Sequence, residues 1–297
     1  MQPSGATERV WTLGDLLEWT AKHLAQKDID TARLDAEVLL AYVVGCKRID
    51  LYGMRYAEIA SPDIRQKYRE LIRRRLEGCP VAYLVGRKEF YGLELKVGPA
   101  VLIPRPDSEH VVIECLALAK TMVHPRVVDI GTGSGNLAIA IAKHHATAEV
   151  TAIDRSGDAL EIARENAAKH EVAQRICFLQ GDLFAALASE EQFHFIVSNP
   201  PYIADEDVAQ LPIGVRQYEP HQALQGGSGG FGFFDRLIRE SQSRLLPGGH
   251  LIVEIGTAQE KPARERLTAI ADFILAPTIE DYSGHPRVLR VQKKVSA

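Results

Sequence analysis

The most informative stretch of this sequence is Val127-Val128-Asp129-Ile130-Gly131-Thr132-Gly133-Ser134-Gly135. Its first four residues have a mostly apolar strand pattern, and they run into a glycine loop that an apolar helix pattern follows. Glycines have no Cβ, so the backbone can turn tightly and approach a ligand closely. The helix that follows presents free N–H groups to a carboxylate. The sequence therefore predicts a ligand site where this strand meets its loop.

Strands and helices alternate on either side of the loop. Strand patterns occupy residues 126–130, 149–154, 176–180, 193–198, 250–255 and 288–291. Helix patterns occupy residues 136–145, 158–170 and 231–246, and we expect Pro247-Gly248-Gly249 to end the last of these. Such alternation predicts an α/β fold with a doubly wound, mostly parallel sheet that helices cover on both faces. Ligands of such sheets lie beyond the carboxyl ends of the strands.

Two regions of different character precede the α/β part. Helix start and stop signals at Thr12, Gly45 and Ser61-Pro62 predict three helices before residue 78. Leu93 and Leu95 alternate with charged residues in a proline-punctuated stretch, which predicts a β-hairpin. We therefore predict three parts, which are a small helical bundle at 1–78, a β-hairpin linker at 79–106 and the α/β domain at 107–297.

Length and composition exclude several classes of protein. At roughly 150 residues per domain, 297 residues suggest about two domains. Contents of 46% hydrophobic and 25% charged residues exclude a disordered or collagen-like chain. The formal net charge of −4 disfavours a protein that binds mainly to nucleic-acid phosphates. Because the start lacks the apolar core of a signal peptide and no apolar run could span a bilayer, we expect a cytoplasmic protein.

The cysteines and histidines show no pattern of a metal centre. None of the four cysteines forms a C-x-x-C pair, so neither a zinc ribbon nor a disulfide framework is indicated. No His, Asp and Glu cluster has the spacing of metal ligands. We expect no metal, no membrane attachment and no direct nucleic-acid binding.

The glycine loop favours a nucleoside ligand without phosphates. A dinucleotide fingerprint would need glycine at Asn136, and a P-loop lysine is missing. Asp154 ends the next strand, where its carboxylate could accept both hydroxyls of an adenosine ribose. Asp182 ends the third strand, near where an adenine would lie. The pattern suits S-adenosylmethionine, although a tight βα turn with Asp154 as a helix cap would read similarly.

A second motif, Asn199-Pro200-Pro201-Tyr202, directly follows the fourth predicted strand. Two prolines fix two φ angles and remove two N–H donors, so Asn199 and the neighbouring carbonyls form a stiff set of acceptors. Such a set can grip both hydrogens of a planar –NH2 group, and Tyr202 offers a flat face to that group. The alternative is a strand-end turn without chemistry. We predict that Asn199, Pro200 and Tyr202 serve catalysis by positioning a weak nitrogen nucleophile.

Together these motifs resemble a known family. The glycine loop, Asp154 and the Asn-Pro-Pro-Tyr turn are similar to those of class I S-adenosylmethionine-dependent methyltransferases, and more narrowly of the HemK/PrmC family of peptide chain release factor glutamine methyltransferases. The most family-specific stretch is Leu102-Ile103-Pro104-Arg105-Pro106-Asp107-Ser108-Glu109. Further matches are Pro80–Gly86, Glu89–Gly92, Tyr218–Pro220 and Leu224–Gly227.

The resemblance implies a Rossmann-like, seven-stranded methyltransferase sheet and a specific reaction. The substrate would be the glutamine of a Gly-Gly-Gln motif in class 1 release factors, the partners of the enzyme. The products would be N(5)-methylglutamine and S-adenosyl-L-homocysteine. The helical domain would dock the release factor. Leu183 stands where some members have an aromatic residue, so stacking against the adenine is lost there.

The family's site residues carry over by position. The resemblance assigns the cofactor to Gly131, Thr132, Gly133, Ser134, Gly135, Asp154, Asp182, Leu183 and Asn199. It assigns the substrate to Asn199, Pro200, Pro201 and Tyr202.

Three other functions remain open on the sequence. A ribosomal-protein glutamine methyltransferase belongs to the same superfamily, and only the resemblance around Arg105-Pro106-Asp107 favours release factors. An adenine-N(6) methyltransferase of DNA or RNA would hold the same planar –NH2, but the acidic net charge stands against it. A nucleoside-binding regulator or RNA-binding module would bind the cofactor without turnover, and it would not need the Asn199–Tyr202 turn.

Overall fold

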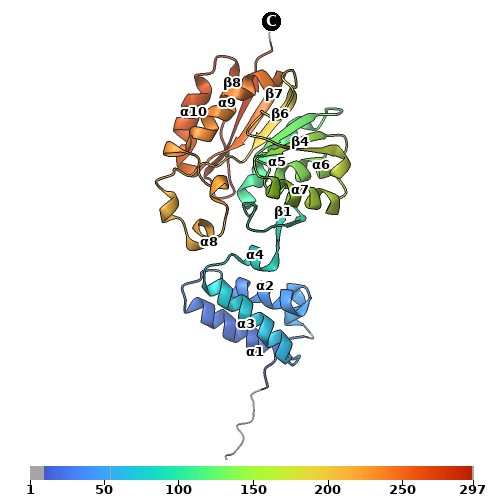
Figure 1. Ribbon diagram of the computed structural model, residues 1–297, viewed down its shortest axis with the longest axis vertical. Helices are drawn as coiled ribbons and strands as arrows, with labels where there is room; N and C mark the ends of the chain where they lie inside the picture. Colours follow the sequence, from blue (N-terminus) through green and yellow to red (C-terminus); the bar gives the residue numbers. More distant parts are fainter. Residues whose placement is uncertain (1–9, 54, 296–297) are drawn as a thin grey trace, which may run out of the picture. The chain divides into compact units, whose positions relative to one another are not determined.

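The computed structural model describes residues 10–53 and 55–295. The chain divides into two compact units, Met1–Gly86 and Arg87–Ala297 (Figure 1). The stretch Met1–Val10, in which we expect no signal peptide, lies almost entirely outside the described residues. Among the helices of the described ranges, none is both long and apolar enough to cross a membrane.

The first unit is a small helical bundle, and its three predicted helices are confirmed. Its elements are α1 (Leu13–Ala25), α2 (Ala32–Val44), the 3-10 helix η1 (Arg48–Tyr52), α3 (Pro62–Leu76) and α4 (Val81–Val85). Thr12 caps α1, because its hydroxyl accepts from the Asp15 amide at 3.0 Å and the Asp15 carboxylate accepts from the Thr12 amide at 3.0 Å. Gly45 ends α2 with φ 73°, a value that favours glycine. Local signals therefore set the helix ends.

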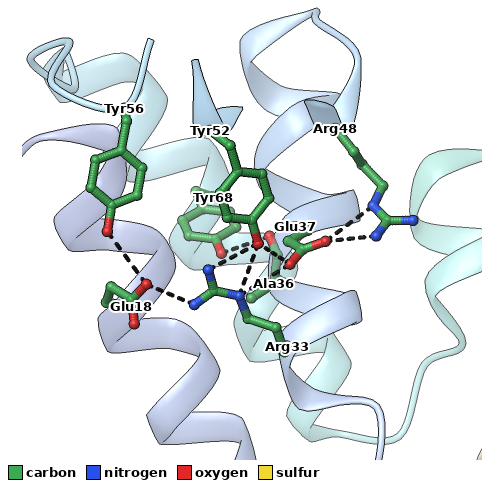
Figure 2. Close-up of polar contacts among 8 residues, drawn as sticks. All are labelled: Glu18, Arg33, Ala36, Glu37, Arg48, Tyr52, Tyr56 and Tyr68. Atoms are coloured by element: carbon green, nitrogen blue, oxygen red, sulfur yellow. Dashed lines mark hydrogen bonds and ion pairs between the residues drawn. The ribbon is translucent and has the colours of Figure 1, made fainter. Parts of the chain in front are cut away.

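Beneath these caps, the bundle is held by a polar cluster around Glu37 of α2 (Figure 2). The Glu37 carboxylate is almost buried and accepts hydrogen bonds from Arg33 at 3.0 Å, from Arg48 at 2.7 Å and from the Tyr52 hydroxyl. Arg33 also donates to Glu18 of α1 at 2.8 Å. Burial by itself would raise the pKa of Glu37, but the hydrogen bonds from Tyr52, Arg48 and Arg33 hold that pKa below its ordinary value. The cluster ties α1, α2 and η1 together.

Replacing Glu37 by glutamine is expected to destabilise this unit by about 1–3 kcal/mol at pH 7, since hydrogen bonds to a charged group are lost. Both tryptophans of the chain, Trp11 and Trp19, lie in this unit, so urea unfolding followed by tryptophan fluorescence measures its stability. A carboxyl with a depressed folded pKa stabilises above its unfolded pKa, near 4.3, and loses that effect as the pH falls through the folded value. The difference between the two proteins should therefore shrink as the pH falls below that unfolded value.

The exposed pair of Glu70 and Arg73 provides the control for this experiment. Glu70→Gln removes a solvent-exposed ion pair of α3 and is expected to leave the stability nearly unchanged. An equal loss of stability in both variants would show that the buried position of Glu37 does not strengthen its contribution.

The second unit contains a mostly parallel sheet, which confirms the predicted fold class. Its strands are β3 (Arg126–Ile130), β4 (Glu149–Asp154), β5 (Ile176–Gln180), β6 (Phe193–Ser198), β7 (Leu245–Glu254), β8 (Phe273–Leu275), β9 (Ile279–Glu280) and β10 (Pro286–Lys293). The strand order is β5-β4-β3-β6-β7-β10-β8, and the short β9 pairs with β10. The first five strands of this order are parallel, and β10 runs antiparallel to β7. The predicted seven-strand path is present in the described residues, with β9 as a short addition.

Helices cover both faces of this sheet (Figure 1). The helices are α5 (Glu109–Ala119), α6 (Asn136–His144), α7 (Gly157–Lys169), α8 (Ile213–Arg216), α9 (Gly232–Arg244) and α10 (Glu260–Thr268). Successive residues of β3 enter opposite cores, because side chains of a strand alternate between the two faces. Val127 packs with side chains of α5 and α6, and Val128 packs with side chains of α9 and α10.

The sequence prediction was wrong at the end of α9, and it missed four of the helices in the described residues. We expected the helix to run to residue 246, but α9 ends at Arg244 and β7 begins at Leu245. Leu245 is fully buried and pairs with Phe193 of β6, and Gly248 takes a positive φ of 80°, so the strand passes through Pro247-Gly248-Gly249. The unpredicted helices α4, α5, α8 and α10 lie outside the patterns that we recognised in the sequence.

The predicted hairpin consists of β1 (Arg87–Phe90) and β2 (Leu93–Lys96). Tyr91 and Gly92 both have positive φ, as a tight hairpin turn of two residues requires. Its apolar side chains Phe90, Leu93 and Leu95 belong to a core of the second unit. The compact units divide at 86/87, whereas the sequence suggested boundaries at 78 and 106. The hairpin is thus part of the α/β unit.

Candidate active site

A cavity of about 440 Å³ lies at the carboxyl ends of β3, β4, β5 and β6. This is the edge of the sheet at which doubly wound folds bind their ligands, and the volume is in the range of small-molecule sites. Its lining includes Gly131, Thr132, Gly133, Ser134, Asp154, Leu183, Asn199 and Pro201. The structure therefore brings residues of both sequence motifs to one cavity.

The three glycines of the loop have different tasks. Gly131 and Gly133 line the cavity with φ of 75° and 55°, and a Cβ on either would meet no atom within 4 Å. Gly135 does not line the cavity. A Cβ there would lie 2.8 Å from Ile139 and 3.2 Å from Ala163, so this glycine lets α6 pack closely against α7. Gly135, which we predicted as a cofactor contact, is thus tightly packed and lies outside the cavity lining.

Asp154 lines the cavity at the end of β4 and braces the glycine loop. Its carboxylate accepts from the Gly133 amide at 2.8 Å and from the Ser156 amide at 2.9 Å. Burial raises the pKa of Asp154, while these backbone hydrogen bonds oppose the rise. A carboxylate has about four lone-pair sites, so acceptor capacity remains for a ribose hydroxyl. The open glycine surface and this carboxylate fit an adenosine.

Asp129 also stabilises the glycine loop. Our sequence analysis did not single it out as a functional residue. It is fully buried in β3, and its carboxylate accepts from the Thr132 hydroxyl at 2.6 Å and from the Ala138 amide at 3.1 Å. Burial raises the pKa of Asp129 to about 7. A charged residue in an otherwise apolar strand was the signal that could have revealed it.

Asp182 and Leu183, both predicted as cofactor contacts, lie differently with respect to the cavity. Asp182 does not line the cavity, and its carboxylate forms an ion pair with Arg236 at 2.9 Å. The predicted strand end at Asp182 was two residues too late, because β5 ends at Gln180 and Asp182 lies in the following turn. Leu183 does line the cavity, with a positive φ of 51° and a nearly buried side chain.

The Asn-Pro-Pro-Tyr turn follows β6, which is the neighbour of β3. Asn199 and Pro201 line the cavity, whereas Pro200 and Tyr202 lie outside the lining. The Asn199 amide nitrogen donates to Ser108 Oγ at 2.8 Å, and within residues 10–53 and 55–295 its carbonyl oxygen has no hydrogen-bond partner. Gln259 donates to the Tyr202 carbonyl at 3.0 Å and so fixes the end of the turn. The turn presents one unused acceptor at the cavity.

Two distant segments form further walls of the cavity, at residues 100–104 and 220–225. The nearly buried Glu219 joins them, because its carboxylate accepts from Arg105 at 2.5 Å and from the Ile103 amide at 3.0 Å. Both segments belong to stretches that carried the family resemblance. The Glu219 carboxylate therefore links the two walls of the cavity.

Replacing Glu219 by alanine is expected to loosen both walls, because it removes the charge partner of Arg105 and the acceptor of the Ile103 amide. The Kd for S-adenosylmethionine should rise about 3- to 10-fold, and hydrogen–deuterium exchange of residues 203–225 should become faster. Glu206→Ala, on the exposed part of the same segment, is the control. Unchanged exchange at 203–225 in the Glu219 variant would refute the role of this ion pair.

Comparisons with known proteins agree with this geometry. The family model of the PrmC N-terminal domain matches residues 15–86, and that of the methyltransferase small domain matches residues 108–214. The release factor glutamine methyltransferase of Rhodopirellula baltica is 42% identical, over 95% of this chain and 97% of the relative. That of Koribacter versatilis is 38% identical, over 96% of this chain and 100% of the relative. The chain belongs to the release factor glutamine methyltransferase family.

The solved structures add support for the fold. A methyltransferase from Pyrococcus furiosus has a TM-score of 0.51 at 19% identity, with 69% of this chain and 90% of that chain covered. The predicted family and the predicted enzyme class are confirmed, and the chain is an S-adenosylmethionine-dependent methyltransferase. Gly131, Gly133 and Asp154 would hold this cofactor. The two glycines would do so through their open backbone surface, and Asp154 through its carboxylate.

Proposed function

We propose that this enzyme methylates the side-chain amide of the glutamine in the Gly-Gly-Gln motif of class 1 peptide chain release factors. The observation that carries the proposal is the similarity, over 84–96% of this chain, to relatives named release factor glutamine methyltransferase at 36–42% identity. The Asn199 carbonyl oxygen, which is at the cavity and has no partner among the described residues, agrees with a substrate that carries an –NH2 group.

The main task of the protein in this reaction is to position the substrate nitrogen. An amide nitrogen is a weak nucleophile, because its lone pair is delocalised into the carbonyl group. The bound S-adenosylmethionine supplies an activated methyl group on a positively charged sulfur. In our proposal Asn199 accepts a hydrogen bond from the amide –NH2 and holds its nitrogen toward that methyl group. Correct positioning can account for about 7–11 kcal/mol of barrier reduction.

The proposed methyl transfer needs no strong base. The nitrogen–methyl bond forms as the sulfur–methyl bond breaks, and the sulfur keeps the bonding electron pair. One proton leaves the nitrogen for solvent, which leaves neutral N(5)-methylglutamine and S-adenosyl-L-homocysteine. The turn's prolines keep its backbone rigid while this happens.

The helical unit is the proposed docking domain for the release factor. A groove of about 410 Å³ on this unit is lined by apolar and basic side chains of α1 and α3 and by Trp11, which precedes α1. Trp19 is half exposed there and stacks on His23, and the nearby Arg65 and Arg69 give the rim a positive charge. Such a surface suits a protein partner with apolar and acidic side chains.

Mass spectrometry of a purified release factor tests the proposal directly. The release factor is incubated with the enzyme and S-adenosylmethionine, and the expected result is one added methyl group on the glutamine of the Gly-Gly-Gln motif. A release factor with asparagine at that position is the matched control, and it should gain no methyl group. Cofactor binding without any gain on the glutamine would overturn the proposal and direct the search to ribosomal proteins and nucleic acids.

A further inference from the structure

A chain of three polar side chains leads from β7 to the Asn-Pro-Pro-Tyr turn. Glu254 at the end of β7 and Ser108 before α5 are both almost completely buried. Ser108 Oγ donates to Glu254 Oε2 at 2.5 Å, and Asn199 Nδ2 donates to Ser108 Oγ at 2.8 Å. Neither Ser108 nor Glu254 lines the cavity. Ser108 therefore contacts Asn199 from outside the cavity lining, and Glu254 contacts Ser108 in turn.

The direction of these hydrogen bonds fixes the orientation of the Asn199 amide. A serine hydroxyl has one proton and two lone pairs. Since the Ser108 proton is directed to the Glu254 carboxylate, Ser108 Oγ can only accept from Asn199. The Asn199 –NH2 must then face Ser108, and its carbonyl oxygen must occupy the other arm of the amide plane. With the amide reversed, two oxygen acceptors would face each other without a proton between them.

We propose that Ser108 and Glu254 are positioning residues that hold the Asn199 carbonyl oxygen ready to accept from the substrate –NH2 group. The inference rests on the proposed function, because it assigns these residues a task in binding an amide. It also explains why a buried carboxylate stands at the end of β7, a position that otherwise carries a cost. Neither residue was among the site residues that we predicted from the sequence.

Charged groups around Glu254 make this arrangement sensitive to pH. Burial raises the pKa of Glu254 to about 7, which the Ser108 hydrogen bond and the charge of Arg287 oppose and the charge of Asp107 reinforces. Arg287 stands on β10, beside β7, and the Tyr202 hydroxyl donates to Glu254 Oε1 at 3.5 Å. A protonated Glu254 can donate to Ser108, which frees the Ser108 proton to turn toward Asn199. The ionised form, present above about pH 7, is therefore the one that enforces the orientation.

Ser108→Ala is the first test, with the rate of methyl transfer measured in a single turnover. We expect about a 10- to 100-fold lower rate, because the Asn199 amide can then rotate. The Kd for S-adenosylmethionine should stay unchanged, and Ser108→Thr, which keeps the hydroxyl, should restore most of the rate. Ser241→Ala is the matched control, since Ser241 is a fully buried serine whose hydroxyl donates only to the Leu237 carbonyl of α9. Equal rates in the Ser108→Ala and Ser241→Ala variants would overturn the inference.

A double-mutant cycle with Asn199→Ala separates positioning from a general effect on the fold. If Ser108 acts through Asn199, Ser108→Ala should lower the rate no further in the Asn199→Ala background. Additive losses would instead show that Ser108 acts independently of Asn199, and they would contradict the proposal.

The pH profile tests Glu254. The single-turnover rate of the unmodified enzyme should rise with pH through about 7, as Glu254 ionises. In Glu254→Gln this rise should disappear, and the rate should stay low across the range. A profile that is the same in both proteins would assign the titration to another group and remove Glu254 from the proposal.

A measurement without turnover keeps this inference separate from the proposed function. In protein labelled with nitrogen-15, the side-chain –NH2 of Asn199 gives an NMR signal whose hydrogen-bonded proton is shifted. Ser108→Ala should abolish that shift, and Ser241→Ala should not. If no release factor is methylated but this shift behaves as expected, the proposed substrate is wrong and the orienting contact stands. If methylation occurs and the shift is unaffected by Ser108→Ala, the inference fails.

Discussion

Replacing Asn199 by alanine is expected to lower the turnover rate by about 10²- to 10³-fold, an effect comparable to the loss of one preorganised hydrogen-bonding group in other active sites. The reason is that Asn199 provides the acceptor at the cavity for which the described residues supply no partner. Without it the substrate –NH2 group loses its orientation toward the methyl group. The loss should appear in kcat, because the interaction matters most when the nitrogen attacks.

Two measurements must accompany the rate. The Tm of the Asn199→Ala variant should stay within a few degrees of the unmodified enzyme, since the side chain is only partly buried and gives up one hydrogen bond to Ser108. Asn166→Ala provides the contrast. Asn166 is fully buried and hydrogen-bonds to Lys96 and Ser134, so its loss should lower the Tm clearly. A near-normal kcat in a folded Asn199→Ala enzyme would refute the role that we assign to this side chain.

Asp154→Ala is expected to weaken cofactor binding by about 10- to 100-fold. Hydrogen bonds to a charged group contribute about 1.5–3 kcal/mol, and about 1.4 kcal/mol corresponds to a factor of ten in Kd. The structure adds a second reason, because the same carboxylate holds the Gly133 amide at 2.8 Å. Its removal therefore loosens the glycine loop and also takes away the acceptor for a ribose hydroxyl. The effect should be largest on the Kd for S-adenosylmethionine and smaller on kcat at saturating cofactor.

Isothermal titration calorimetry with S-adenosyl-L-homocysteine measures this affinity without turnover. Asp154→Asn is the matched variant, since it keeps the shape and one carbonyl acceptor, and its Kd should lie between those of the unmodified enzyme and Asp154→Ala. An unchanged Kd in Asp154→Ala would mean that Asp154 only braces the loop and does not bind the ribose.

The sequence by itself determined the local elements and the family. Ser61 and Pro62 start α3, Gly45 ends α2, and the strand before the glycine loop lies at 126–130 as predicted. These features depend on helix and strand propensities and on side chains within a few residues, so the local sequence is enough to predict them. The two motifs could also be assigned to strand ends, and the parallel order then brought both to one edge of the sheet.

Only the tertiary structure decided which side chains meet. Ser108 and Glu254 are 146 positions apart, and Arg105 and Glu219 are 114 apart, so no local pattern pairs them. The strand order places β10 beside β7, which brings Arg287 near Glu254. Likewise, pairing of the buried Leu245 with Phe193 ended α9 earlier than its sequence suggested, and Asp182 pairs with Arg236 outside the cavity lining. Contacts of this kind follow from packing across the sheet, which periodicity and spacing along the chain do not encode.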